Sequence, residues 1–147
     1  MKRILMIVIL AGLMLAACAP AATDVEASGV WARTGMAGGT SAIYLTLVNG
    51  TGVDDELLSA SSDVADAVEI HESRVGENGT MMMVPQESVP LAAGATVEFK
   101  QGGLHIMLVG LKQELKVGDT FVVTLHFKNH ADIVLTVEVK EGLMMDM

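Results

Sequence analysis

Hydrophobic and polar residues alternate through much of the chain after residue 40. The pattern is clear in TSAIYLTLVNGTG (40–52), where Ile43, Leu45 and Leu47 share one side before a turn-forming run. It recurs in LKVGDTFVVTLHF (115–127) and in DIVLTVEVK (132–140), and turn residues separate these segments. A period of two residues is that of a β-strand, whose successive side chains point to opposite faces. The sequence therefore predicts an all-β fold, an antiparallel Greek-key β-sandwich of immunoglobulin-like type over residues 29–140.

One short helix is predicted, in the segment SDVADAV (62–68). Ser62 or Asp63 would cap a single turn there, because their side-chain oxygens accept hydrogen bonds from the free N–H groups at a helix start. The sequence shows no long 3.6-residue period, no internal repeat and no glycine-rich phosphate loop. The chain of 147 residues is long enough for one domain with a substantial core.

The N-terminus has the form of a secretory signal. Lys2 and Arg3 precede the apolar run ILMIVILAGLMLAA (4–17), which as a helix would span only about 21 Å of a hydrocarbon core about 30 Å thick. The run ends in LAAC (15–18), which resembles a bacterial lipobox, so residues 1–17 are predicted to be removed and Cys18 to be lipidated. An ordinary signal whose cleavage site contains cysteine is the alternative. Cys18 is the only cysteine, so no internal disulfide can form.

The mature chain is then expected to have three parts. Residues 18–28 form a flexible linker, residues 29–140 the domain, and residues 141–147 a methionine-containing tail. Removal of Lys2 and Arg3 changes the formal net charge from −9 to −11. Such a chain is repelled by nucleic acid, so DNA or RNA binding is not expected. The expected location is extracytoplasmic, with attachment to the membrane through the lipid.

Strand phase divides the four histidines into two pairs. His126 lies on the polar side of its strand and His130 in a turn, so both are predicted to be solvated surface residues. His71 and His105 also oppose the apolar side of their strands, but each has methionine nearby in sequence. His105 shares its side of GGLHIMLVGL (102–111) with Met107, opposite Leu104, Ile106 and Leu108.

Methionines accompany this second pair of histidines. Met81, Met82 and Met83 follow His71 across a GENG turn, at hairpin spacing. Flexible filling of the core is the ordinary role of methionine. However, Met107 is phased away from the core, and three consecutive strand residues cannot all face inward. These thioethers therefore require another explanation.

Imidazole and thioether donors together favour copper. Thioethers suit Cu(I), whereas Zn²⁺, Mg²⁺ and Ca²⁺ prefer thiolate or carboxylate donors. A blue-copper electron-transfer centre needs a Cys thiolate, which the mature domain lacks apart from Cys18. No Ser/His/Asp arrangement is evident in the sequence, so an enzyme is not expected.

The spacing of these residues resembles that of the PCu(A)C family of periplasmic copper chaperones. The family pattern is a His, a Met twelve residues later, and a His-x-Met after 21 further residues; the matching positions here are His71, Met83, His105 and Met107. The flanking text TSAIYLTLVN (40–49) and EIHES (69–73) also matches. Many relatives place a Met next to the first His, where this chain has Glu72 and Ser73, and some carry a His- and Met-rich extension that binds Cu(II). The tail here has methionines but no histidine.

The resemblance implies a cupredoxin-like fold and a carrier that binds one Cu(I) through His71, Met83, His105 and Met107. It further implies delivery to a copper-accepting protein, such as the CuA centre of cytochrome c oxidase or another copper carrier. The alternative from a different class is a metal-free immunoglobulin-like envelope lipoprotein with a role in adhesion or assembly, for which the sandwich and the anchor suffice.

Overall fold

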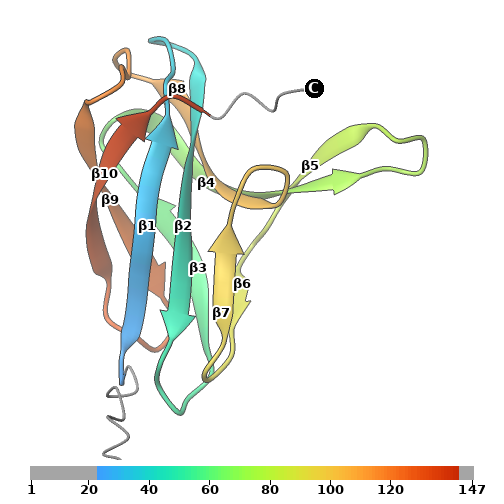
Figure 1. The fold of residues 1–147 in the computed structure, drawn as a ribbon, viewed down its shortest axis with the longest axis vertical. Helices are drawn as coiled ribbons and strands as arrows, with labels where there is room; N and C mark the ends of the chain where they lie inside the picture. Colours follow the sequence, from blue (N-terminus) through green and yellow to red (C-terminus); the bar gives the residue numbers. More distant parts are fainter. Residues whose placement is uncertain (1–22, 143–147) are drawn as a thin grey trace, which may run out of the picture.

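The computed structural model describes residues 23–142, and every helix or strand assigned in that range is a strand (Figure 1). The strands are β1 (Val25–Arg33), β2 (Thr40–Asn49), β3 (Asp55–Ser61), β4 (Ala65–Val75), β5 (Met81–Pro85), β6 (Val89–Leu91), β7 (Thr96–Phe99), β8 (Leu104–Leu111), β9 (Thr120–Phe127) and β10 (Ile133–Lys140). Within residues 23–142 there is accordingly no helix with the length and apolarity to cross a membrane.

Two boundaries differ from the sequence expectations. The short helix expected at 62–68 is wrong: Asp63 and Val64 form a turn, and Ala65 already begins β4. From Ala65 onward β4 is hydrogen-bonded along β8, and these ladder bonds outweigh the single helical turn that a cap could start. β1 begins at Val25, so residues 25–28, expected in the linker, belong to the first strand. The expected signal peptide, Cys18 and residues 143–147 of the tail lie outside the described residues.

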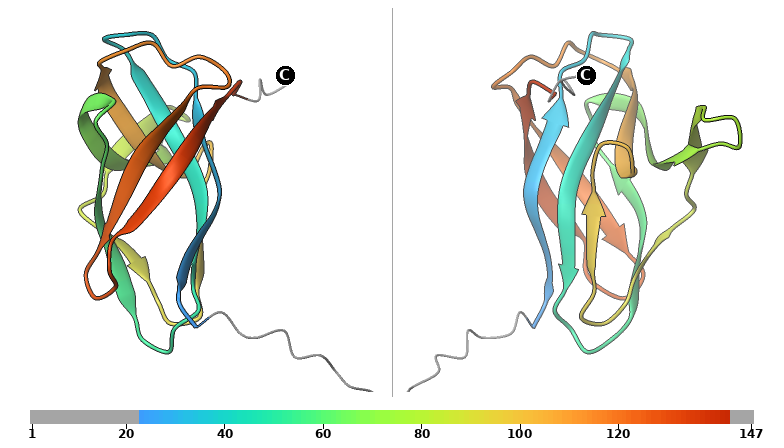
Figure 2. Two further views of the ribbon diagram at one scale, coloured as in Figure 1. Left: turned by 90° about the vertical axis from the view of Figure 1, so that its left-hand side faces the viewer. Right: turned by 45° about the vertical axis from the view of Figure 1, so that its right-hand side comes forward.

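The strands form one continuous sheet that folds back on itself into two layers (Figure 2). Their order is β5-β4-β8-β7-β2-β1-β10-β9-β3-β6. Most pairs are antiparallel, and the parallel pairs are β1 with β10 and β7 with β8. The fold-back occurs at β1–β10, which sets β9 and β3 across from β2 and β8. The predicted antiparallel sandwich is confirmed.

The core lies between the two layers and contains the residues that the alternation predicts. In β2, Ile43, Leu45 and Leu47 are at most 3% exposed, and in β8 Ile106 and Leu108 are fully buried. The facing strands contribute Val123, Leu125, Val137 and Val139, which are also fully buried. Burial of each such side chain stabilises the fold by about 1.5–3 kcal/mol, so these residues hold β2 and β8 in place.

The opposite face of β2 is also covered, which the alternation does not indicate. Ala42 and Tyr44 alternate with the core residues, yet they are only 8% and 5% exposed. Tyr44 packs on Trp31 of β1 with a ring-centroid distance of 4.8 Å, and Ala42 lies opposite Met107 of β8. This outer face is therefore a second, smaller packed region, and His105 and Met107 belong to it.

β4 and β5 extend beyond the body of the sandwich as a two-stranded arm, which projects to the side in Figures 1 and 2. β4 pairs with β8 only as far as Glu72, whereas Ser73, Arg74 and Val75 pair with β5 alone. A turn closed by Gly79 joins the two strands of the arm, and its φ of 73° lies in the left-handed region that favours glycine. The hairpin predicted from the GENG turn is thus present.

Candidate metal centre

The register between β4 and β8 brings the two predicted histidines together. His71 lies directly opposite His105, and their ring centroids are 6.0 Å apart at an interplanar angle of 84°. Two residues along the same face, Glu69 lies opposite Met107. Cross-strand partners on one face have Cβ atoms about 5 Å apart, so these four side chains share one patch of the outer face.

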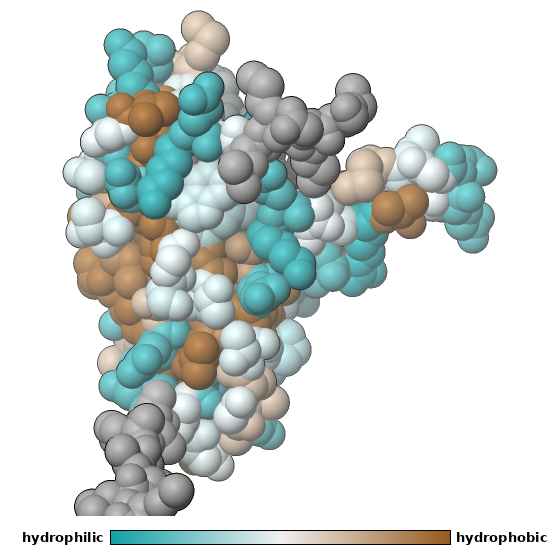
Figure 3. Space-filling model, viewed as in Figure 1, coloured by the Kyte–Doolittle hydropathy of each residue, from teal (hydrophilic) through white to brown (hydrophobic). Residues whose placement is uncertain are grey.

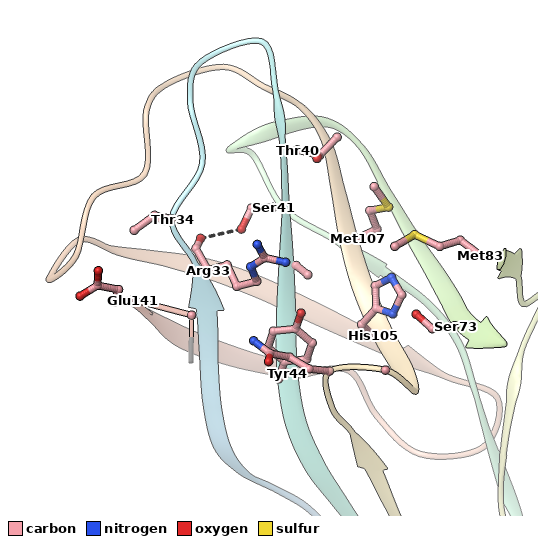
Figure 4. A pocket seen from close by; sticks show the side chains of 14 residues that line it. Arg33, Thr34, Thr40, Ser41, Tyr44, Ser73, Met83, His105, Met107 and Glu141 are labelled. Carbon is pink, nitrogen blue, oxygen red and sulfur yellow. Dashed lines mark hydrogen bonds between the residues drawn. The ribbon is translucent and has the colours of Figure 1, made fainter. Parts of the chain in front are cut away.

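The fourth predicted residue, Met83, reaches this patch from the arm. Met83 lies opposite Ser73 on β5, on the same face of the hairpin as His71. An open cavity of about 530 Å³ is lined by Met83, His105 and Met107, with Ser73 and Tyr44 among its other walls. In Figure 4 the two thioethers point toward one another above the His105 ring. His71 does not line this cavity and lies beside it, in edge contact with the His105 ring.

A hydrogen bond fixes the tautomer of His105. Nδ1 of His105 lies 3.0 Å from the carbonyl oxygen of Gly103. A carbonyl can only accept, so Nδ1 must carry the hydrogen, and in the neutral ring Nε2 then has a free lone pair. Metal-binding histidines commonly donate their other N–H to a backbone carbonyl in this way. The backbone of the loop before β8 therefore prepares Nε2 of His105 as a donor.

His71 has no such partner in the described part of the chain. Its side chain is 12% exposed, and both ring nitrogens are buried without a hydrogen bond. Nε2 lies 2.8 Å from Oε2 of Glu69, but this contact lacks the alignment of a hydrogen bond. Leaving a buried polar group unsatisfied costs about 1–3 kcal/mol, so it calls for a ligand or another explanation. A metal ion bound at this imidazole would satisfy one nitrogen, and the donor set therefore fits a soft cation.

The exposure of the four residues is graded. His105 is only 4% exposed, because Tyr44, Ser73 and the loop before β8 surround it. Met107 is half-buried, whereas Met83 is 58% exposed. The imidazoles thus form the floor of the patch and Met83 its accessible side.

Two nearby residues were not singled out from the sequence. Glu69 could have been found by phase, since it precedes His71 by two residues and so shares its face. Arg33 lines the cavity at the end of β1 and could not have been found, because only the β1–β2 pairing brings it there.

The other two histidines lie at the surface, with side chains 35% and 22% exposed, but each is hydrogen-bonded and is not the free solvated residue that was predicted. His126 accepts or donates at Nε2 with Ser61 Oγ (2.8 Å), and its Nδ1 lies 2.9 Å from Asp132. A Ser–His–Asp chain is therefore present in the fold, although the sequence did not reveal it. It lies on β3, β9 and the following loop, away from the cavity lined by His105, and Ser61 and Asp132 are exposed. The two bonds tie these elements together.

His130 is 22% exposed and bonds to Asp24 through Nε2 and to the Ala131 carbonyl through Nδ1. Burial alone would lower the pKa of His130, but these bonds and the nearby carboxylates raise it overall. The bond to His130 and the Val25 N–H hold the pKa of Asp24 below its usual range. Burial opposes ionisation of Asp55, but three backbone N–H groups lower its pKa overall.

Comparison with known proteins gives one family and several similar folds. Residues 25–139 match the model of the LpqE-like lipoprotein family. "Putative lipoprotein Lxx21020" from Leifsonia xyli is 30% identical over 82% of this chain and 72% of its own length. "Uncharacterized protein RP573" from Rickettsia prowazekii is 35% identical over 67% of this chain, which spans 55% of that protein.

Among solved structures, similar folds occur in PCuAC domains. The copper-bound PCuAC domain from PmoF2 superposes with a TM-score of 0.68 at 20% identity, covering 81% of this chain and 94% of that domain. The solution structure of CuI-DR1885 from Deinococcus radiodurans superposes with a TM-score of 0.59 at 27% identity, covering 83% of both chains. The cupredoxin-like fold implied by the family resemblance is thereby confirmed.

Proposed function

Because the chain belongs to the LpqE-like lipoprotein family, we propose that it is an extracytoplasmic lipoprotein that carries one Cu(I) ion to a partner protein. The proposed ligands are two imidazoles and two thioethers: His71, Met83, His105 and Met107. Lipidation at Cys18 would attach the carrier to the membrane. The proposed recipient is a copper-accepting protein, such as the CuA subunit of cytochrome c oxidase or another copper carrier.

The observation that carries this proposal is the imidazole of His71, whose ring nitrogens have no hydrogen bond within the described residues and which lies beside the His105 ring. The two more exposed histidines of the described fold, His126 and His130, are hydrogen-bonded to carboxylates or carbonyls. In the candidate centre, His105, Met83 and Met107 line one cavity and His71 lies beside it. Two imidazoles and two thioethers would form a neutral and soft donor set that suits Cu(I). The copper-bound PmoF2 domain and CuI-DR1885, which share this fold, support the same assignment.

The graded exposure of the ligands suits a carrier. The buried imidazole of His105, oriented by the Gly103 carbonyl, and the mostly buried imidazole of His71 would retain the ion. Exposed Met83 leaves one side of the site open to an incoming ligand from a partner, so the ion can leave by stepwise exchange of donors. Thioethers require no deprotonation, so only the histidines couple binding to pH.

Titration of the mature domain with Cu(I) against a competing chelator tests the proposal. We expect one ion per chain, and X-ray absorption of the loaded protein should count two nitrogen and two sulfur neighbours. Met107→Leu keeps the apolar volume and removes one sulfur, so it should weaken binding by roughly 10- to 100-fold and lower the sulfur count by one. Absence of stoichiometric binding would favour the metal-free envelope lipoprotein instead.

Two further measurements test the partner and the anchor. Loaded protein mixed with a soluble CuA domain should transfer its ion to that domain, and failure with every copper-accepting protein tried would contradict a delivery role. Cys18→Ser should abolish lipid attachment, as read from the mass of the mature protein and its release from membranes. Retention on membranes without the cysteine would contradict the proposed anchor.

A further inference from the structure

Three consecutive methionines stand on the arm, but only one of them lines the cavity. Met81, Met82 and Met83 are 61%, 51% and 58% exposed, and Val75 beside them is 70% exposed. Figure 3 shows apolar surface on this projecting arm. Each large apolar side chain that stays exposed gives up the stabilisation of about 1.5–3 kcal/mol that its burial would provide. The proposed copper site uses Met83, so the other two thioethers remain to be explained.

The register of the hairpin separates these two methionines. Met81 lies opposite Val75 and Met83 opposite Ser73, so Met81 and Met83 share one face of β5. Met82 lies opposite Arg74 on the other face, and a Cβ at Gly76 would lie 3.4 Å from its sulfur. Met82 is therefore directed away from the candidate centre. Met81 lies on the same face as Met83, one position farther out along the arm.

The spacing of Met81 and Met83 permits a shared ion. Alternate residues of a strand are about 6.6 Å apart, and methionine has three flexible side-chain torsions. The two thioethers can therefore approach one soft cation from the same face. Met81 is also the more exposed of the two and lies farther from the buried imidazoles.

We propose that Met81 is a hand-over ligand, which binds Cu(I) transiently together with Met83 while the ion leaves or enters the imidazole floor. The inference rests on the proposed function. In this exchange a Cu–S bond to Met81 forms as a Cu–N bond to a histidine breaks, so the oxidation state stays the same and no proton is transferred. A partner then meets the ion at the arm, outside the cavity, where its own ligands have access.

The test compares Met81→Leu with Met82→Leu. Both changes keep an apolar side chain of similar volume on the arm and remove one sulfur, so they separate donation by sulfur from apolar docking. Stopped-flow mixing of the loaded protein with excess Cu(I) chelator gives the release rate, and equilibrium competition gives the affinity. We expect Met81→Leu to slow release by about tenfold with an affinity within about twofold of the unchanged protein. Met82→Leu should change neither quantity.

The outcomes distinguish this inference from the proposed function. If the unchanged protein does not bind Cu(I), the proposed function fails. If it binds but Met81→Leu releases copper at the original rate, only the hand-over role is overturned. Equal slowing by both variants would also overturn it, since the effect would then belong to the hairpin. A loss of affinity above tenfold would make Met81 a resident ligand and would contradict a transient one.

Discussion

The two pairs of histidines in this domain have opposite surroundings. His126 and His130 each bind a carboxylate through one nitrogen and a further oxygen through the other. His105 uses one nitrogen on a backbone carbonyl, and neither nitrogen of His71 has a hydrogen bond within the described chain. Both ring nitrogens are hydrogen-bonded in each histidine of the first pair. In the second pair, His71 has only a poorly aligned contact of 2.8 Å between Nε2 and the Glu69 carboxylate.

This difference distinguishes structural histidines from binding ones better than exposure does. By exposure alone, His71 and His105 are the more buried pair and would be taken for core residues. Their ring nitrogens without hydrogen bonds, together with the thioethers of Met83 and Met107, are the basis for proposing a ligand at this group. The availability of a lone pair, rather than the histidine itself, marks the candidate centre.

The largest expected effect is on copper affinity. His71→Ala/His105→Ala removes two of the proposed donors, so the Cu(I) affinity should fall by more than about 100-fold, the upper end of the loss for an outer-shell partner. The matched double variant His126→Ala/His130→Ala removes two hydrogen-bonded histidines and should leave the affinity within about threefold. Competition with a chelator measures both. A similar loss of Cu(I) affinity in both double variants would contradict the proposed difference between the two histidine pairs.

Next in size is a contrast within β8 itself. Ile106→Ala empties a fully buried site and should lower the free energy of unfolding by about 2–5 kcal/mol. Met107→Ala, on the half-buried outer face, should cost only about 1–2 kcal/mol. Urea denaturation of the metal-free proteins measures both values. A larger loss for Met107 would mean that the outer face is part of the main core.

A smaller effect, of opposite sign, is expected at His71. His71→Phe replaces a ring that has two unsatisfied nitrogens with an apolar ring of similar shape. The metal-free protein should therefore be more stable by about 1 kcal/mol while its copper affinity falls. His130→Phe should instead be destabilising, since it leaves Asp24 without its partner. Thermal unfolding without metal compares the two, and a loss of stability in the His71 variant would refute the assignment of unsatisfied nitrogens.

The smallest effect is a pH dependence at the hydrogen-bonded pair. Because the pKa of His130 is raised on folding, this residue contributes fully to stability below pH 6.5, its ordinary pKa. That contribution is lost as the pH rises through the pKa of His130 in the folded protein. Because the pKa of Asp24 is lowered on folding, this residue contributes fully to stability above pH 3.8, its ordinary pKa. That contribution is lost as the pH falls through the pKa of Asp24 in the folded protein. His130→Gln should thus lower the melting temperature most between these two values and less at pH 8. An equal effect at pH 5 and pH 8 would contradict this.

Local alternation could predict the strands whose faces differ in polarity. β2, β8, β9 and β10 each bury one side, so Ile43, Ile106 and Val123 are identifiable from neighbouring residues alone. The same pattern does not predict that the outer face of β2 is covered. Burial of Tyr44 depends on Trp31 and on the strand that carries Met107, which are brought together only by non-local pairing.

The residues of the candidate centre could be predicted from the sequence, but their burial and their positions relative to one another could not. Phase and spacing single out His105 with Met107, but the position of His71 opposite His105 depends on a register between strands far apart in the sequence. The error at His130 has the same origin. A histidine in a turn indicates solvent locally, and its partner Asp24 is 106 residues away along the chain.

The direction of β1 has a further consequence. It runs from Val25 at one end of the domain to Arg33 at the cavity wall, a length of about 26 Å at roughly 3.3 Å per residue (Figure 1). An attachment to lipid upstream of Val25 would therefore hold the opening a full strand length above the bilayer. A recipient of the proposed carrier would then meet the cavity at the end of β1 opposite the attachment.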